Sequence, residues 1–217
     1  MKKLLSVSII AIAIINPFVV QAAVVNFSNF SQAGDGFYYL GNQVIWEEFK
    51  FSSNGGPYGN QLGVWQDGSV NHPIGGNANT SLMEFYAGST TTMVKIDNGA
   101  FQLNSIDLAA WGIAQTGPLR IQFIGTKSDN TTVSQEFFLG NPGGTTPVLQ
   151  TFYFGSPFTD LVSVSFTQGA YIFDMAYQFN NINVSPVPIP AAAWLFGSAL
   201  AGLQLFGKRR SSTKAGP

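Results

Sequence analysis

The sequence predicts an all-β fold, a two-sheet β-sandwich of the jelly-roll type, and three observations support this. Apolar residues alternate with polar ones along most of residues 23–184, and clusters of Gly, Asn, Asp and Pro separate the alternating runs. No segment of this body has a helical face longer than about two turns. Because about eight to ten alternating runs occur, we expect two packed sheets, with a closed barrel as the alternative.

The clearest predicted strands lie in the second half of the body. The runs 118–125, 131–140 and 160–169 place apolar residues at alternate positions. This pattern is typical of a strand with one face in the core and the other in water. The segment KSDNTT, residues 127–132, lies between two of these runs and has the composition of a hairpin turn.

Two predicted strands change the face on which their apolar residues lie. In FQLNSIDLAAW the apolar parity changes at the central Asn-Ser pair, and in YQFNNINV it changes at the Asn-Asn pair. One extra residue in each strand would keep both apolar halves on the same side of the sheet. We therefore predict β-bulges near Asn104–Ser105 and near Asn180–Asn181.

The N-terminus has the layout of a secretory signal peptide. Two lysines precede a short apolar stretch, residues 4–15, and small residues follow before the first predicted strand. The apolar stretch is too short to span a bilayer comfortably. Val20 and Ala22 fit the −3 and −1 positions, so we expect export and cleavage after Ala22, with residues 1–22 removed.

Charge and cysteine content limit what the exported body can do. Between Ala23 and Pro190 there are four Lys and Arg but eleven Asp and Glu, a net charge of −7 against −1 for the whole chain. The body has no basic patch to neutralise phosphates, so we predict no nucleic-acid binding. The chain has no cysteine, so its stability has to come from an ordinary core rather than from disulfides.

No catalytic constellation stands out, and the sequence predicts no enzyme. His72, the only histidine, precedes a proline in a loop, and the chain has no G-x-S-x-G motif. Glu47 and Glu48 are neighbours on a predicted strand and would point to opposite faces, so they cannot jointly flank one bond. We interpret them as solvated or edge-guarding charges, because a glycosidase would need a partner such as Asp107 or Asp174.

The sequence predicts no cofactor, with a structural calcium ion as a weaker alternative. Asp35 and Asp174 are candidate oxygen ligands for such an ion. No loop has the ligand spacing of an EF-hand, and most Asp-Gly and Asp-Asn pairs here are typical of turns.

One loop region is a candidate carbohydrate-binding site. Tyr58 and Trp65 lie in or beside Gly-rich loops, in GGPYGNQLGVWQDG, and Asp67 follows them. An exposed ring can stack on the apolar face of a sugar while amides and carboxylates bind its hydroxyl groups. The same residues could instead pack a loop onto the sandwich, and both interpretations stay open.

The C-terminus indicates a membrane-spanning segment. Residues 185–190, SPVPIP, cannot pair as a strand because of their prolines, and residues 191–207 are mostly apolar. About 18 residues of helix span about 27 Å, which just crosses a thin bilayer core. The basic cap Lys208, Arg209 and Arg210 favours the cytoplasmic side for residues 208–217. A buried core helix is the alternative.

This tail resembles the PEP-CTERM sorting signal of exported Gram-negative bacterial proteins. VPIPAAAWLFGSALAGLQLFGKRR contains the motif, the apolar helix and the basic end in the same order. Ile189 stands where the name-giving Glu would be, within the sorting motif Val187, Pro188, Ile189 and Pro190. YQFNNINV is similar to the final F-D-N-I-x-V strand of such proteins, with Asn180 in place of the Asp.

The resemblance implies processing by an exosortase near residues 187–190. It implies transient anchoring in the inner membrane with a cytoplasmic C-terminus, followed by release to the cell surface or extracellular space. Such proteins are linked to exopolysaccharide and biofilm matrix. We therefore expect a non-catalytic surface or matrix protein, with a carbohydrate-binding module or a sandwich-fold glycoside hydrolase or esterase as alternatives.

Overall fold

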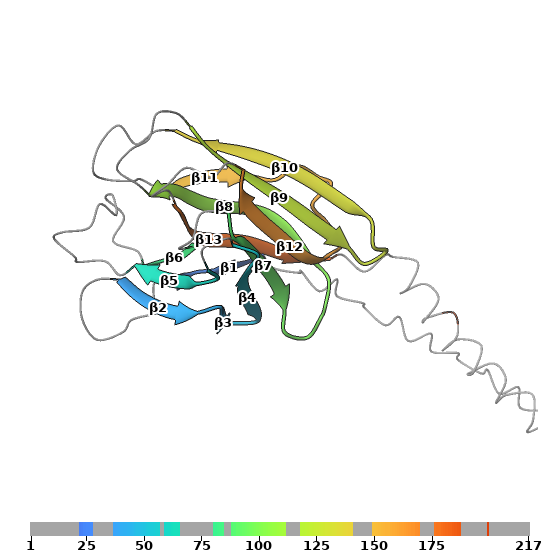
Figure 1. Cartoon of the computed structure of the whole chain (residues 1–217). Helices are drawn as coiled ribbons and strands as arrows, with labels where there is room; N and C mark the ends of the chain where they lie inside the picture. The colour runs from blue at the N-terminus through green and yellow to red at the C-terminus, as the bar shows by residue number, and fades with distance from the viewer. Residues whose placement is uncertain are drawn as a thin grey trace, which may run out of the picture.

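The computed structural model describes residues 22–27, 37–56, 59–65, 80–84, 88–111, 118–140, 149–169 and 176–187, and Ala199. Thirteen strands lie in these segments, and every pairing between them is antiparallel (Figure 1). The strands form two sheets, because within the described residues only the pairing of Phe101 with Leu161 connects one group of strands to the other.

The first sheet has seven strands. Its order is β2-β5-β6-β13-β8-β11, and β1 lies beside the second half of β13. The strands are β1 (Ala23–Val25), β2 (Phe37–Gly41), β5 (Leu62–Trp65), β6 (Ser81–Glu84), β8 (Phe101–Trp111), β11 (Gln150–Tyr153) and β13 (Ala176–Pro186).

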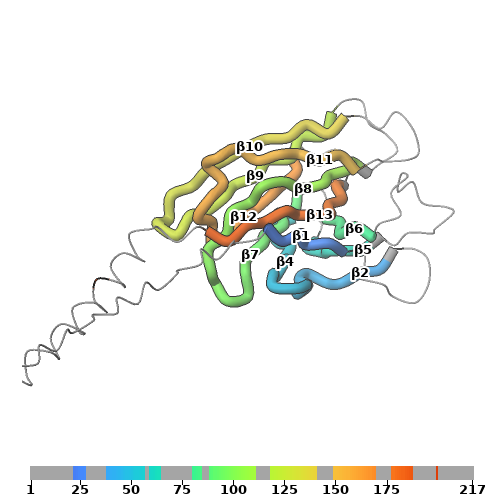
Figure 2. Tube along the Cα trace, turned by 180° about the vertical axis from the view of Figure 1, so that it is seen from behind, coloured from blue at the N-terminus to red at the C-terminus, as the bar shows by residue number. Residues whose placement is uncertain are grey.

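The second sheet has six strands in the order β3-β4-β7-β12-β9-β10. They are β3 (Gln43–Trp46), β4 (Phe49–Asn54), β7 (Thr90–Lys95), β9 (Leu119–Lys127), β10 (Thr132–Leu139) and β12 (Leu161–Gln168). β10 and β11 lie along the same side of the sandwich in both views (Figures 1 and 2).

The eight strands from β6 to β13 have jelly-roll connectivity. They divide into the sets β6-β13-β8-β11 and β7-β12-β9-β10, so the chain passes repeatedly from one sheet to the other. This strand order is that of two interlocked Greek keys. The predicted all-β sandwich is therefore confirmed, and β1 to β5 widen its two sheets.

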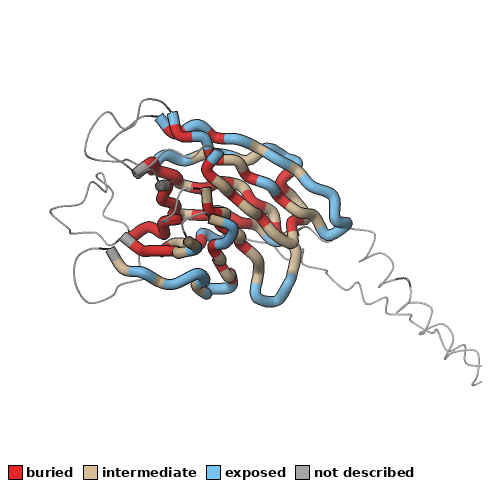
Figure 3. The backbone as a smooth tube through the Cα atoms, in the orientation of Figure 1, coloured by how far each residue is buried: buried red, intermediate tan, exposed pale blue. Residues whose placement is uncertain are grey.

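Phenylalanine rings from both sheets form the core between them. Phe166 on β12 meets Phe179 on β13 edge to face, with ring centroids 5.0 Å apart, and stacks on Phe123 at the same separation. Phe49 on β4 meets Phe101 on β8 at 5.4 Å. Buried segments lie in the central strands and exposed ones along the outer strands (Figure 3). Aromatic pairs of this geometry add about 0.5–1.5 kcal/mol each beyond their buried area.

The predicted hairpin at residues 127–132 is confirmed. The backbone N–H of Lys127 donates to Thr131 and that of Asn130 donates to Lys127, both at 2.9 Å, between the paired strands β9 and β10. Asn130 has a φ of 66°, which asparagine tolerates better than most residues. Asp129 closes the turn by accepting hydrogen bonds from the Thr131 backbone N–H and hydroxyl.

The predicted terminal segments lie almost wholly outside the described residues. The expected signal peptide contributes only Ala22, and the expected membrane span, residues 191–207, contributes only Ala199. In the part of the chain that the structure describes, no helix has the length and hydrophobicity needed to cross a bilayer. β13 continues through Pro186, so Ser185 and Pro186 pair with β8, contrary to the prediction that residues 185–190 cannot pair as a strand. The other domain boundaries at the two ends stay predictions.

Candidate functional site

Most residues singled out from the sequence as site candidates lie outside the described residues. These include the sugar-binding candidates Tyr58 and Asp67 and the calcium candidates Asp35 and Asp174. Trp65 ends β5, but its side chain is not among those described. Among the residues described, no three His, Asp or Glu side chains cluster as metal ligands. Of the sorting motif, only Val187 is described, and the rest of the motif and the basic cap, residues 208–210, lie outside.

The two predicted bulges are present and lie opposite each other in one ladder. Asn180 pairs with Asp107, Asn183 pairs with Ser105, and Val184 pairs with Leu103. β13 therefore carries one extra residue after Asn180, and β8 carries one extra residue at its Asn-Ser pair. The two insertions compensate, so the register is the same on both sides. Each bulge also turns neighbouring polar residues toward the outer face.

A continuous row of polar side chains crosses the outer face at the bulges. Asn26, beside β1, donates to Asn181 on β13 at 3.0 Å, and Asn181 donates to Asp107 on β8 at 2.7 Å. The hydroxyl of Thr151 on β11 donates to the other carboxylate oxygen of Asp107 at 2.6 Å. We call these four residues the amide row. Its members are half-buried or exposed, so they are ordered by each other and still meet solvent.

A second group of polar residues lies beside the amide row. The bulge residue Asn104 donates to Asn183 at 2.9 Å and to Ser185 at 2.8 Å. Tyr153, two residues after the row's Thr151 on β11, points to the same face and is 73% exposed. Val24 on β1 pairs with Asn183 and is also exposed. The outer face of the first sheet thus combines ordered amides with an exposed aromatic ring.

Asn180 has a different role from its neighbour Asn181. Its side chain is fully buried, accepts from the backbone N–H of Phe27 at 3.0 Å and donates to the carbonyl of Thr80 at 2.9 Å. An aspartate carboxylate could not make the second of these bonds, because it has no hydrogen to donate. An amide therefore fits this buried position, because it can both accept and donate.

The interior holds a polar cluster of its own. Glu84 on β6 points between the sheets and is 1% exposed. Its two oxygens accept from Ser53 on β4 at 2.8 Å and from Thr91 on β7 at 2.9 Å. Thr91 also meets the Tyr177 hydroxyl at 2.9 Å. Burial, and then the charge of Glu84, raises the pKa of Tyr177 well above its ordinary value, which keeps this hydroxyl neutral.

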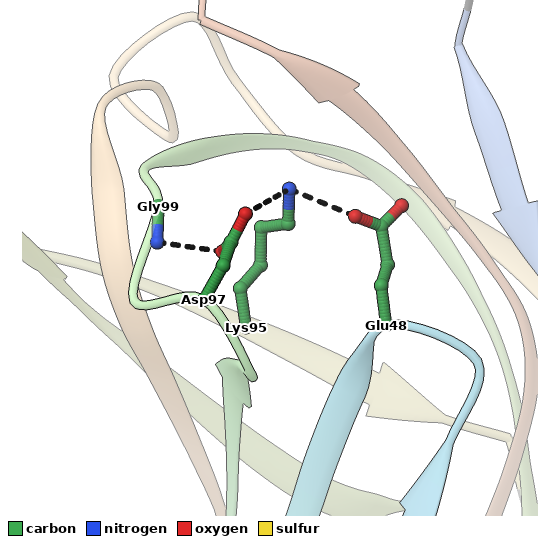
Figure 4. A network of polar contacts seen from close by, with 4 residues as sticks. All are labelled: Glu48, Lys95, Asp97 and Gly99. Atoms are coloured by element: carbon green, nitrogen blue, oxygen red, sulfur yellow. Dashed lines mark hydrogen bonds and ion pairs between the residues drawn. The ribbon is translucent and has the colours of Figure 1, made fainter.

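The carboxylates Glu47 and Glu48 occupy the turn between β3 and β4. Glu47 has a positive φ of 52°, and Glu48 pairs with Lys95 at 2.8 Å (Figure 4). Lys95 also lies 3.6 Å from Asp97, which accepts from the Gly99 backbone N–H at 2.8 Å. The hydrogen bond that Lys95 donates to Glu48 raises the pKa of Lys95, and the hydrogen bond from the Gly99 N–H lowers the pKa of Asp97. The two glutamates thus lie in a turn, not on a strand as the sequence predicted.

The sequence analysis did not identify the amide row as a site. Its members come from residues 26, 107, 151 and 181, which only the strand pairing brings together. The parity switches were the available signal, because a bulge in an Asn-Asn or Asn-Ser pair places extra polar side chains on the outer face. The parity switches predict the bulges but do not indicate which polar side chains meet beside them.

Comparisons with known proteins identify no family. No family model matches the chain, and no curated relative is found. The adhesin domain K1 of Lys-gingipain from Porphyromonas gingivalis W83 aligns at 11% identity over 70% of this chain and 99% of its own, with a TM-score of 0.40. The CBM22-1 xylan-binding domain of Paenibacillus barcinonensis Xyn10C aligns at 11% identity over 73% and 99%, with a TM-score of 0.36.

A third solved structure falls in the same range. The family 11 carbohydrate-binding module of the Clostridium thermocellum cellulase Lic26A-Cel5E aligns at 9% identity over 73% of this chain and 99% of its own, with a TM-score of 0.31. At TM-scores this low, none of these similarities carries a functional conclusion.

Proposed function

We propose that this chain is an exported, non-catalytic β-sandwich that binds neutral polysaccharide at the cell surface or in the extracellular matrix. The observation that carries the proposal is the amide row, residues 26, 181, 107 and 151, with the exposed ring of Tyr153 beside it. Each sugar unit offers hydroxyl groups that both donate and accept hydrogen bonds, and an apolar face of C–H groups. On the outer face of the first sheet, the amide row can bind the hydroxyl groups and the Tyr153 ring can stack on the C–H face.

The side chains of this face are held in place before a ligand arrives, which favours binding. Asn181 and Asp107 are already held by neighbouring side chains, so little side-chain entropy is lost when a ligand arrives. Their remaining lone pairs and N–H groups face outward from a rigid ladder. A site on paired strands keeps its geometry better than a site on loops.

The charge of the body supports a neutral ligand. With a net charge of −7 over residues 23–190, the domain repels polyanions such as uronic-acid polymers. Asp107 is the one carboxylate in the amide row, and its two oxygens can accept hydrogen bonds from sugar hydroxyl groups. We therefore expect neutral glycans to be preferred over acidic ones.

The absence of catalysis is part of the proposal. Both oxygens of Asp107 accept short hydrogen bonds, from Thr151 and Asn181, which suits a binding group better than a general acid or nucleophile. A hydrolase on the same sandwich is the alternative. Release of reducing ends from a bound polysaccharide, lost in Asp107→Asn, would favour the hydrolase.

Export and sorting complete the proposal and rest on the termini of the sequence. The signal-peptide pattern, residues 187–190 and the basic cap resemble a PEP-CTERM protein that is processed by an exosortase-type enzyme at the inner membrane. Intact-mass analysis of surface material should find a chain that begins near Ala23 and ends near Pro190. A mature chain that still contains residues 195–206 would indicate a permanent anchor instead.

Affinity electrophoresis in gels that contain xylan, mixed-linkage glucan, dextran or alginate tests the binding function. For Tyr153→Ala, the apparent affinity for a neutral polymer, obtained from the retardation, should fall about tenfold, because a stacking contact is lost. Tyr39→Ala is the matched control: Tyr39 is 57% exposed on β2, at the opposite edge of the same sheet. Equal losses for both variants would contradict a site at Tyr153.

The loop candidates from the sequence can be tested in the same gels. Trp65→Ala reports on the predicted site at Tyr58, Trp65 and Asp67. Loss of retardation in Trp65→Ala but not in Tyr153→Ala would move the proposed site from the outer face to that loop region.

A further inference from the structure

We propose that the outer face of the second sheet is a second polysaccharide site, so that one domain bridges two polymer chains. The inference rests on the proposed function and extends it from binding to cross-linking. It starts from the exposed ring of Phe138 on β10, which is 57% exposed, and from the charged and amide groups next to it.

A fixed set of planar polar groups lies beside Phe138. Arg120 on β9 is the strand partner of Phe138, and its guanidinium contacts Glu136 at 3.0 Å. Gln122 also approaches Glu136, at 3.5 Å. Arg120 and Glu136 together carry no net charge, so the cluster suits a ligand with many hydroxyl groups and no charge of its own. A guanidinium and a carboxylate held side by side supply both donors and acceptors.

Gly169 provides the space in which the Arg120 side chain lies. A Cβ at this position would come within 2.8 Å of Arg120 Nε and 3.2 Å of its Cδ. The backbone N–H of Gly169 also donates to the Arg120 carbonyl at 2.8 Å. Any larger residue at 169 would displace the arginine side chain, so the position of the guanidinium depends on this glycine.

A polar row continues from the cluster across the second sheet. Glu136 pairs with Gln122, Gln122 with Thr167, and Thr167 with Thr90, on strands β10, β9, β12 and β7. The hydroxyls of Thr90 and Thr167 share a hydrogen bond of 2.7 Å. Three strand spacings of about 4.8 Å make this row about 14 Å long. We call these four residues, from Glu136 to Thr90, the hydroxyl row. It is the counterpart on the second sheet of the amide row on the first.

The two rows share one layout. Each has four members and ends on the outermost strand of its sheet, and each has an exposed aromatic residue two positions after its last member: Tyr153 after Thr151 on β11, and Phe138 after Glu136 on β10. β10 and β11 are joined by Gln135, which donates to the Tyr153 carbonyl and accepts from the Gly155 N–H, both at 3.0 Å. The two rings therefore lie on the outer faces of different sheets, beside the edge at which β10 and β11 meet.

Two faces that point in opposite directions engage two polymer chains more readily than one. The sheets of a sandwich are about 10 Å apart, and the side chains of the two rows extend outward from them. A protein with two such sites increases the effective strength of binding to a matrix, because the second contact is intramolecular once the first has formed. The chemistry points to cross-linking of a neutral polysaccharide network.

The test uses the full-length chain, solubilised in detergent and fractionated to one copy per particle. Wild type, Tyr153→Ala, Phe138→Ala and the double variant are compared in two assays: affinity electrophoresis in the neutral polymer that retards wild type, and turbidity on mixing with the same polymer in solution. Ile45→Ala is the control for Phe138→Ala, because Ile45 is 58% exposed at the opposite edge of the second sheet.

We expect each single variant to keep part of the retardation, reduced about tenfold, and the double variant to lose it. Turbidity should appear only with wild type and Ile45→Ala. Gly169→Val, which displaces Arg120, should behave like Phe138→Ala.

Three results would overturn the inference. Unchanged retardation and turbidity in Phe138→Ala would leave the first face as a single site, and the proposed function would stand. If both single variants lost retardation and wild type caused no turbidity, one polymer would be wrapped around the β10–β11 edge. No retardation of wild type by any neutral polymer would overturn both the inference and the proposed function.

Discussion

Glu84 and Asp107 are both carboxylates on strands of the first sheet, and each accepts two hydrogen bonds from side chains. Glu84 points into the sandwich and receives them from Ser53 and Thr91, which belong to the second sheet. Asp107 points outward and receives them from Thr151 and Asn181, which belong to its own sheet. One carboxylate therefore connects the two sheets, and the other orders a surface.

The difference lies in what each carboxylate can still contact. Glu84 is 1% exposed, so its partners are fixed by the fold, and its loss would remove the acceptor of the buried Ser53 hydroxyl and one of the partners of Thr91. Asp107 is half-buried within the amide row, between Asn181 and Thr151, and remains accessible to a ligand. Substitutions at the two positions should therefore separate stability from binding.

Glu84→Ala should have the largest effect on stability. Removal of a buried carboxylate that two hydroxyls need should cost about 3 kcal/mol of unfolding free energy, because the cavity and the unpaired hydroxyls add up. Urea denaturation measures the loss. Glu84→Gln, which keeps the volume and one acceptor oxygen, should lose less. A loss below about 1 kcal/mol in Glu84→Ala would mean that Glu84 does not connect the sheets.

Asn180→Asp should come next. The change removes the donor to the Thr80 carbonyl and places a carboxyl group at a fully buried position, at a cost of about 2 kcal/mol. Asn183→Asp is the matched control, since Asn183 is half-buried on the outer face and its side-chain oxygen accepts from Asn104, a bond that an aspartate keeps; it should lose well under about 1 kcal/mol. Equal midpoints of urea unfolding for the two variants would remove the distinction between the buried and the surface amide.

Asp107→Ala should affect binding more than stability. We expect about a tenfold loss of affinity for a neutral polysaccharide, because Asn181 and Thr151 lose the group that orients them. The unfolding free energy should change by about 1 kcal/mol or less. Affinity electrophoresis and urea unfolding of the same preparation measure both quantities. A large loss of stability with unchanged affinity would reverse the assignment of the two carboxylates.

The smallest effects should come from the Lys95 network of Figure 4. The pKa of Lys95 is raised, so its stabilising contribution is complete below the unfolded pKa and is lost as the pH rises through the folded value. The pKa of Asp97 is lowered, so its contribution is complete above the unfolded value and is lost as the pH falls through the folded one. Lys95→Met should flatten the alkaline side of the stability profile. An unchanged profile would show that the Glu48 pair contributes nothing measurable.

The alternation of apolar residues was sufficient to predict the fold class, and the parity switches located both bulges. The hairpin at residues 127–132 could be predicted because its determinants are local. The order of the strands could not, because the pairing of β13 with β8 joins residues more than sixty positions apart and depends on the packing of the whole core. Sequence alone therefore indicated a jelly roll by strand number rather than by connectivity.

The candidate site was less predictable than the fold. Asn26, Asp107 and Thr151 look like ordinary surface residues in their local sequence, and they become a site only through the pairing of four strands. Trp65 was more conspicuous, since an aromatic residue in a Gly-rich loop is a familiar signal for binding. Tyr153, which ends a short strand, carries no such local signal, and its exposure follows from the parity of β11.

The opposed bulges have a consequence for how this sheet can change over time. Deletion of Asn104 alone would shift half of β8 by one position against β13 and turn its core residues outward. Deletion of one residue at the Asn181 bulge as well would restore a regular ladder, with the core intact but the amide row gone. The two insertions must therefore be gained or lost together, and a homologue with neither could keep the same sandwich while presenting a plain surface to its surroundings.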